Sequence, residues 1–155
     1  MIDSDASAIE GPVYLDASAW VKLYVQELHS DALNAALLTR QDVFVSDVGA
    51  TEVASALGRA CREGRLDRDV ARRLHRRMRQ HLRQGVFQRL DLTPRVHAAA
   101  ERWLLTASVP TRAGDALHLA LATTFAMETI VSYDPRLNLA ARSIGLLVAT
   151  PGAPA

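Results

Sequence analysis

The stretch VYLDASAW, residues 13–20, decides the fold. Its first three residues are apolar and β-prone, whereas helical periodicity begins at Ser18 and runs to residue 25. A strand that turns directly into a helix is the building unit of α/β proteins, in which helices cover both faces of a mainly parallel sheet. Asp16 stands at the turn between the two elements.

The same alternation continues along the chain. Further β-prone runs are predicted at residues 43–46, 87–92, 129–133 and 146–150. Helical periodicity fills the intervals, at residues 30–39, 48–63, 67–84, 94–106, 113–126 and 135–144. No linker or repeat interrupts the pattern. We therefore expect one domain over residues 12–150 with flexible ends at 1–11 and 151–155.

Composition narrows the class of protein. A chain of 155 residues with 49% hydrophobic content can build one sizeable core. The single cysteine, Cys61, allows neither an internal disulfide nor a cysteine-based zinc site, which favours a reducing cytoplasm. No stretch approaches the ~20 apolar residues of a membrane span, and no basic start precedes an apolar run of signal-peptide length. We expect a cytoplasmic protein without a membrane partner.

Two acidic residues lie where predicted strands end. Asp16 closes the first strand and Asp134 follows the fourth, and ligands of such sheets bind beyond the carboxyl ends of the strands. Each also fits an ordinary helix N-cap, and Pro135 after Asp134 is typical of the first position of a helix. Capping does not exclude metal binding, because a carboxylate has several lone pairs to share.

Two other acidic residues fall on predicted helices. Glu52 lies within the apolar stripe of helix 48–63, so we expect it to point inward, where it needs either a bound cation or an arginine such as Arg59 or Arg112. Asp115 lies in the first turn of the most apolar helix. There the helix dipole alone can stabilise it, and a bound cation is the alternative explanation.

The four acids together offer only oxygen ligands. Neither a pair of histidines at metal-binding spacing nor a cysteine cluster accompanies them. Hard cations prefer such ligands, so the sequence predicts a Mg²⁺ or Mn²⁺ site. A cation of this kind activates a water and neutralises charge on a phosphate, which indicates hydrolysis of a phosphodiester.

Four segments in this order resemble the PIN-domain ribonucleases, and among them the VapC-type toxins of toxin–antitoxin pairs. The segments are YLDASAWVKL (14–23), EVASAL (52–57), RAGDALHLA (112–120) and VSYD (131–134). The resemblance covers residues 13 to about 148. An acidic extension of about eleven residues before the first strand departs from the usual pattern.

The resemblance implies a three-layer α/β sandwich with a five-stranded parallel sheet in the order 3-2-1-4-5. It implies a Mg²⁺- or Mn²⁺-dependent endoribonuclease that forms homodimers and is neutralised by a small antitoxin, whose C-terminal segment enters the active site. Asp16, Glu52, Asp115 and Asp134 match the acidic constellation of the family, with Asp16 and Asp115 as direct metal ligands. Ser18 matches a hydroxyl position that orients Asp16 or a metal-bound water, although a hydroxyl at a helix start explains it equally.

Basic residues supply further candidates. Residues 59–83 carry a charge of +7, against −6 for the rest of the chain, which suggests a polyanionic partner. Contacts to RNA phosphates are one interpretation of this segment and a solvated helix surface is the other; the residues concerned are Arg72, Arg73, Arg76 and Arg77. Arg112 could contact a phosphate or pair with an acid. His118, one turn beyond Asp115, is either a satisfied core histidine or a hydrogen-bond donor to the site.

Three other functions fit parts of the pattern. One is a PIN-fold nuclease of RNA processing outside a toxin–antitoxin pair, and another is a catalytically silent module that binds RNA or a partner. A silent module would have no need of four acids. The third is a phosphotransferase of the haloacid-dehalogenase type, which is disfavoured because Ser18 stands where that family has a second aspartate.

Overall fold

Five parallel strands form a single sheet in the order β3-β2-β1-β4-β5 in the computed structural model, which describes residues 9–154. The predicted α/β class and the strand order implied by the resemblance are therefore confirmed. Each β-prone run of the sequence contains one strand. The strands are β1 (Val13–Leu15), β2 (Val43–Ser46), β3 (Gln88–Leu90), β4 (Thr129–Val131) and β5 (Leu147–Ala149).

The central strand β1 determines the two faces of the sheet. Tyr14 pairs with Phe44 of β2 on one side and with Ile130 of β4 on the other, in parallel register. Val13 and Leu15 belong to one hydrophobic cluster and Tyr14 to the other, because successive side chains of a strand point to opposite faces. All three are fully buried, as expected for a parallel sheet covered on both sides.

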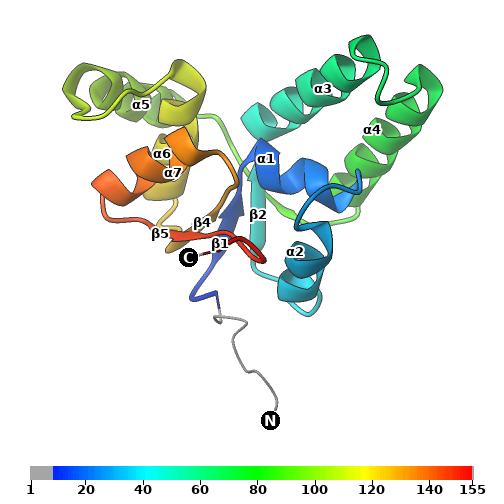
Figure 1. Ribbon diagram of the computed structural model, residues 1–155. Helices are drawn as coiled ribbons and strands as arrows, with labels where there is room; N and C mark the ends of the chain where they lie inside the picture. The colour runs from blue at the N-terminus through cyan, green and yellow to red at the C-terminus, as the bar shows by residue number, and fades with distance from the viewer. Residues whose placement is uncertain (1–8, 155) are drawn as a thin grey trace.

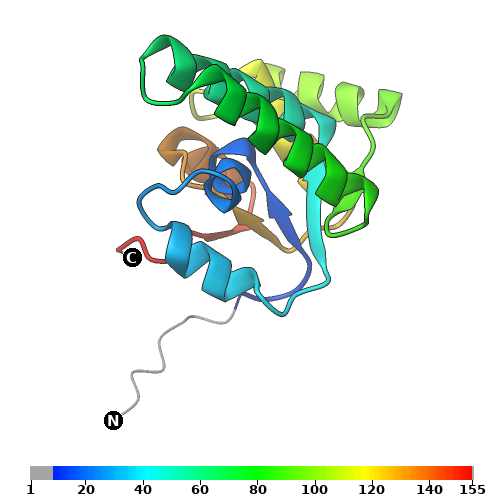
Figure 2. The same cartoon turned by 90° about the vertical axis from the view of Figure 1, so that its right-hand side faces the viewer.

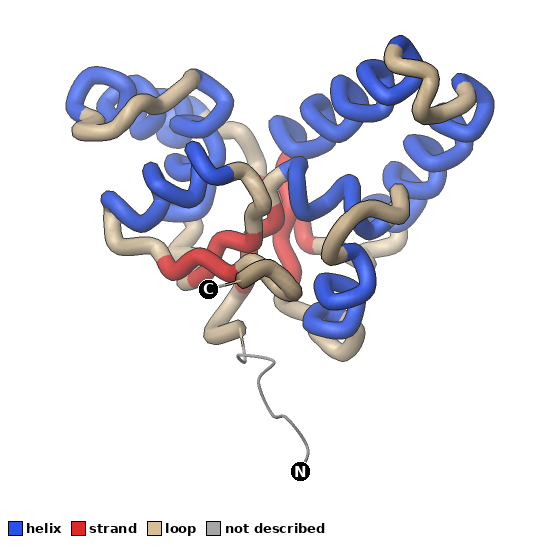
Figure 3. The backbone as a smooth tube through the Cα atoms, in the orientation of Figure 1, coloured by secondary structure: helices blue, strands red, loops and turns tan. Residues whose placement is uncertain are grey.

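The helices agree with the sequence prediction to within a few residues, except near the first strand. The predicted helix 18–25 is instead a short α-helix followed by a 3₁₀ turn. Figure 3 shows that helices make up most of the fold around a small central sheet. They are α1 (Ala17–Trp20), η1 (Val21–Leu23), α2 (Ser30–Leu37), α3 (Asp47–Arg62), α4 (Arg68–Arg83), α5 (Pro94–Thr106), α6 (Ala113–Thr124) and α7 (Pro135–Ser143).

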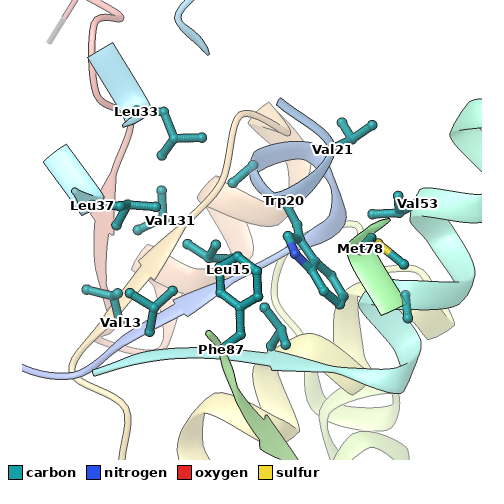
Figure 4. Packing of buried hydrophobic residues seen from close by; sticks show 14 of the residues in the cluster. Val13, Leu15, Trp20, Val21, Leu33, Leu37, Val53, Met78, Phe87 and Val131 are labelled. Atoms are coloured by element: carbon teal, nitrogen blue, oxygen red, sulfur yellow. The ribbon is translucent and has the colours of Figure 1, made fainter. Parts of the chain in front are cut away.

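The helices form two layers, one on each side of the sheet (Figure 1). Helices α1 to α4 share a core with Val13 and Leu15, and α5 to α7 share a core with Tyr14. Figure 4 shows the first core, in which the ring of Trp20 meets that of Phe87 edge to face at a centroid distance of 5.8 Å. The predicted three-layer arrangement follows from this division.

Helices α3 and α4 form a long antiparallel pair that projects from the sheet (Figures 1 and 2). Only Ala71 and Met78 of α4 are buried, and all of its arginines except Arg79 are exposed. The narrow apolar line of this helix is enough to attach it to α3 and the core, while the rest of its surface stays charged.

Both ends of the described chain contact the domain. The guanidinium of Arg40 donates hydrogen bonds to the carbonyls of Ile9 and Gly11, and the hydroxyl of Tyr133 donates to the carbonyl of Pro151 at 2.8 Å. The outer parts of the predicted flexible ends, residues 1–8 and 155, lie outside the described residues. No helix between residues 9 and 154 is long and apolar enough to cross a membrane.

Candidate active site

Asp16 lies at the exit of β1, where its side chain caps α1. The Oδ1 atom accepts a hydrogen bond from the backbone N–H of Ala19 at 2.9 Å. The hydroxyl of Ser18 donates to the same carboxylate at 2.7 Å, and that of Ser132 donates at 2.7 Å from the exit of β4. Asp16 is only 4% exposed. It therefore acts as a cap and is also the buried centre of a polar cluster.

Serine hydroxyls join the exits of the two neighbouring strands. Ser18 accepts a hydrogen bond from the backbone N–H of Tyr133 at 2.8 Å, and Ser132 accepts one from that of Asp134 at 3.1 Å. Asp16 and Asp134 are thereby connected through one shared serine. The role of Ser18 in orienting Asp16, one of the two interpretations of the sequence, matches this geometry.

Within residues 9–154, no cationic side chain donates a hydrogen bond to Asp16. All its donors are neutral: one backbone amide and two hydroxyls. Burial raises the pKa of Asp16, while these hydrogen bonds and any positive charge on His118 act in the opposite direction. A buried carboxylate of this kind would be stabilised by a cation.

Asp115 lies in the first turn of α6, as predicted, and is 7% exposed. Its Oδ2 atom accepts the backbone N–H of Arg112 at 2.9 Å and the Nε–H of Arg136 at 2.8 Å. The side chain of Arg112 is exposed, and only its backbone contacts the acid. Arg136 also reaches Asp134, with 3.4 Å between Nη2 and Oδ2. A single guanidinium therefore bridges Asp115 and Asp134.

Glu52 points toward α6 but is only partly buried, so the sequence prediction of its burial is wrong. Its side chain is 41% exposed because Glu52 sits at the edge of the apolar stripe of α3. Neither Arg59 nor Arg112 is its partner. Instead, the Oε2 atom of Glu52 lies 2.7 Å from Nε2 of His118, which is 2% exposed. His118 is therefore both a satisfied core histidine and a donor to the site, the two interpretations left open by the sequence.

A chain of hydrogen bonds extends from Glu52 into the core. Nδ1 of His118 lies 2.6 Å from the hydroxyl of Tyr14, which lies 2.7 Å from that of Ser46. Ser46 also accepts the N–H of Gly49, as the cap of α3.

One direction satisfies every group in this chain. Burial raises the pKa of Tyr14, so its hydroxyl stays protonated. We assign the Ser46 hydroxyl as donor to Tyr14, the Tyr14 hydroxyl as donor to Nδ1, and the Nε2–H of a neutral imidazole as donor to Glu52. Glu52 is thereby oriented from β1, β2 and α6 at once.

The four acids form two linked parts. Asp16, Asp134 and Asp115 are connected through Ser132 and Arg136, whereas Glu52 is held separately by His118. Within residues 9–154, no three His, Cys, Asp or Glu side chains converge tightly enough to hold a metal ion. The donor set fits a hard divalent cation in chemistry, since it supplies carboxylate oxygens and one buried, uncompensated charge.

Four residues of the site were not predicted: Tyr14, Ser46, Ser132 and Arg136. Tyr14 and Ser132 lie inside the quoted segments, but a buried strand tyrosine and a serine have many ordinary explanations. Arg136 carried a clearer signal. It is a cation in the first turn of a helix, where the helix dipole disfavours positive charge.

The arginines of α4 occupy a different surface. Arg72, Arg73, Arg76 and Arg77 are all exposed. Arg72 pairs with Asp69 at 3.1 Å on the same helix. This arrangement is compatible with both interpretations of the basic segment, a solvated helix and a surface for RNA.

The family model described as "PIN domain" matches residues 13–143, which include all four acids. The chain belongs to the PIN-domain family. Within that family its curated relatives are VapC proteins, in agreement with the resemblance seen in the sequence.

Two of these relatives come from Mycobacterium tuberculosis. The PIN domain is 35% identical to ribonuclease VapC46 over 142 residues, which cover 90% of this chain and 97% of the relative. It is 29% identical to ribonuclease VapC47, over 91% of this chain and 98% of the relative.

Solved structures share the fold at low sequence identity. The crystal structure of Mycobacterium tuberculosis VapC20, described as a sarcin–ricin loop cleaving toxin, has a TM-score of 0.72 and 15% identity over 90% of this chain and 99% of that one. FitAcB from Neisseria gonorrhoeae has a TM-score of 0.64 and 20% identity over 90% and 97%. FitAB bound to a DNA fragment gives the same score and identity, over 92% and 97%.

Proposed function

We propose that this VapC-type PIN-domain protein is a divalent-metal-dependent endoribonuclease and the toxin of a toxin–antitoxin pair. One observation carries the proposal: Asp16, a buried carboxylate that accepts no hydrogen bond from a cationic side chain of residues 9–154, lies at the carboxyl end of the central strand and is linked by hydrogen bonds to two further acids. The VapC46 and VapC47 relatives, both ribonucleases by name, support RNA as the substrate.

Different side chains would bind the cation and orient the binding residues. Asp16 and Asp115 would hold Mg²⁺ or Mn²⁺, with Glu52 and Asp134 supporting the site directly or through water. A cation bound there would supply an activated water and would neutralise charge on the scissile phosphate. Ser18 and Ser132 fix the carboxylate of Asp16, and His118 fixes that of Glu52, so that both acids are oriented before substrate arrives.

Cleavage of RNA by the purified protein tests this function. Cleavage is expected with Mg²⁺ or Mn²⁺, loss of it with EDTA, and loss of it in Asp16→Asn at any metal concentration. Asp31→Asn provides a matched control, since Asp31 is an exposed acid on α2. Equal cleavage by all samples would indicate a contaminating nuclease, and absence of cleavage of every RNA tested would refute the catalytic proposal.

The α4 arginines would contact the RNA backbone outside the site. Replacement of Arg76 and Arg77 by Glu is expected to weaken binding of a non-cleavable RNA and to reduce its salt dependence, because each neutralised phosphate releases counterions. Arg102→Glu with Arg95→Glu on α5 is a control of equal charge change at exposed positions. Unchanged binding at low salt in the α4 variant would leave the solvated-helix interpretation.

The partner would be a small antitoxin whose C-terminal segment enters the acidic site. Support comes from the VapC relatives and from the FitAB neighbours of the same fold. A homodimer is also expected, and the exposed Leu104 and Leu105 at the end of α5 supply apolar surface for it. Sedimentation of the wild type and of Leu105→Asp tests the dimer; a monomeric wild type would contradict it.

A further inference from the structure

Arg136 is the only cationic side chain among the described residues that pairs with any of the linked acids Asp16, Asp115 and Asp134. Its Nε–H donates to Asp115 at 2.8 Å and its Nη2 approaches Asp134 at 3.4 Å. Its backbone N–H also donates to Asp134 at 2.9 Å. Two acids matched to the family's metal site are thus already paired with a positive charge.

The position of Arg136 in its helix is electrostatically unfavourable. It is the second residue of α7, and the first turn of a helix has exposed N–H groups that disfavour a cation. α7 has no acid of its own in that turn; Asp134 precedes it as the cap. The contacts across the site, above all that to Asp115 on α6, therefore account for the placement of the guanidinium.

A divalent cation and this guanidinium compete for the same lone pairs. Oδ2 of Asp115 already accepts two hydrogen bonds, from the Arg112 amide and from Arg136. A cation that binds Asp115 must take this oxygen from Arg136 or use Oδ1 beside a positive charge. In either case the guanidinium opposes cation binding, through lost hydrogen bonds or through repulsion.

The guanidinium competes with a cation at Asp115 and Asp134 but not at Asp16. Its carboxylate has no contact with Arg136, and its donors are neutral. A cation can therefore approach Asp16 first and gain the charge compensation that this acid lacks. The Arg136 side chain is 32% exposed, so it has room to leave the acids toward solvent.

We propose that Arg136 is an internal counter-ion of the acidic site, which holds Asp115 and Asp134 together in the metal-free protein and is displaced from Asp115 when a divalent cation binds. The inference rests on the proposed function, because it assumes that the site takes a cation. Arg136 is then a positioning residue that sets the cation concentration at which the site becomes loaded.

Calorimetric titration with Mn²⁺, without RNA, tests the inference. Arg136→Gln is expected to bind Mn²⁺ about three- to tenfold more tightly than the wild type, since a partly exposed charge contact has been removed. Arg142→Gln removes the same charge from an exposed position near the end of α7 and should change affinity less than about twofold. Arg136→Lys keeps one charge but cannot span both acids, so it should fall between wild type and Arg136→Gln.

Thermal denaturation supplies a readout independent of affinity. Arg136→Gln should melt below the wild type in EDTA, because Asp115 and Asp134 lose their counter-ion, and should gain more from saturating Mn²⁺ than the wild type does. Arg136→Lys, with its charge retained, provides the comparison if the glutamine variant folds poorly.

The outcomes separate the two proposals. Mn²⁺ binding by wild type with equal or weaker binding by Arg136→Gln would overturn the counter-ion role and leave the metal site intact. Failure of wild type, Arg136→Gln and Arg136→Lys alike to bind Mn²⁺ would overturn the metal-dependent function and this inference with it. Tighter binding by both Arg136→Gln and Arg142→Gln would show a general charge effect and refute a specific role.

Discussion

Asp16 and Asp115 occupy similar positions in the sequence but differ in whether a cationic side chain pairs with their carboxylate. Both carboxylates are buried, both lie at helix starts and both match the family's acidic positions. Within residues 9–154, Asp16 accepts hydrogen bonds from neutral donors alone, whereas Asp115 is paired with the Arg136 guanidinium. The comparison shows that burial alone does not tell which acid has an internal counter-ion. Asp16, which has none among the described residues, would gain the most from the proposed cation.

The largest effect is expected from Asp16→Asn. Cleavage should fall roughly 10²–10³-fold because the proposed direct ligand of the cation is lost. The same change should stabilise the metal-free protein by about 1 kcal/mol near neutral pH, since it removes a desolvated charge while the serine hydroxyls can rotate to suit an amide. Urea denaturation in EDTA measures the stability.

The pH dependence of that stability gives a sharper result. The pKa of Asp16 is raised in the folded state above its ordinary value of 3.8, so the folded protein holds this proton more tightly than the unfolded chain. Wild-type stability therefore falls as pH rises from about 4 through the raised pKa, and Asp16→Asn lacks this loss. The difference in unfolding free energy between Asp16→Asn and the wild type should therefore increase, in favour of the variant, as pH rises from about 4 through the raised pKa. A difference of constant size would contradict the uncompensated charge.

An intermediate effect is expected from Tyr14→Phe, which breaks the hydrogen-bond chain behind Glu52. The change removes the acceptor of the Ser46 hydroxyl proton, although Ser46 still accepts the N–H of Gly49, and it leaves Nδ1 of His118 without a donor, at a cost of about 1–3 kcal/mol. Cleavage should fall about tenfold, because Glu52 loses its fixed orientation. Urea denaturation and initial cleavage rates provide the two measurements.

The chain contains a matched control for this variant. The hydroxyl of Tyr24 lies 2.9 Å from Nδ1 of His81, so it forms the same kind of tyrosine–histidine pair in a partly exposed position. Tyr24→Phe should cost less stability and leave cleavage unchanged. If Tyr14→Phe and Tyr24→Phe lose activity equally, the hydrogen-bond chain through Tyr14 does not position Glu52.

The smallest effect is expected from Gly114→Ala. A Cβ at residue 114 would lie 2.7 Å from Oε1 of Glu52, so the carboxylate must move. Alanine favours helix by up to about 1 kcal/mol over glycine. We therefore expect cleavage to fall about two- to fivefold with no loss of stability. Gly58→Ala, whose nearest neighbour is a flexible arginine atom at 3.4 Å, should stabilise the protein and keep full activity.

The sequence was sufficient for the fold and for the elements on which the four acids lie, but not for the partners of those acids. Apolar runs and helical periodicity depend on local residue order, so the strands and most helices could be read directly. The partial burial of Glu52 could not be read in this way, because packing against the neighbouring helix α6 determines which residues at the edge of the α3 stripe are buried. Arg136 and His118 reach acids 21 and 66 residues away, and a single sequence contains no signal for such distant pairs.

The all-parallel sheet has a consequence for synthesis of the protein. Parallel neighbours need long crossover connections, so none of these strand pairs can form as a local hairpin. Asp16 emerges early from the ribosome, but Ser132, Asp134 and Arg136, which complete its surroundings, lie near the end of the chain. A nascent or truncated polypeptide therefore lacks a formed site. The proposed nuclease site can form only after the residues up to Arg136 have been translated.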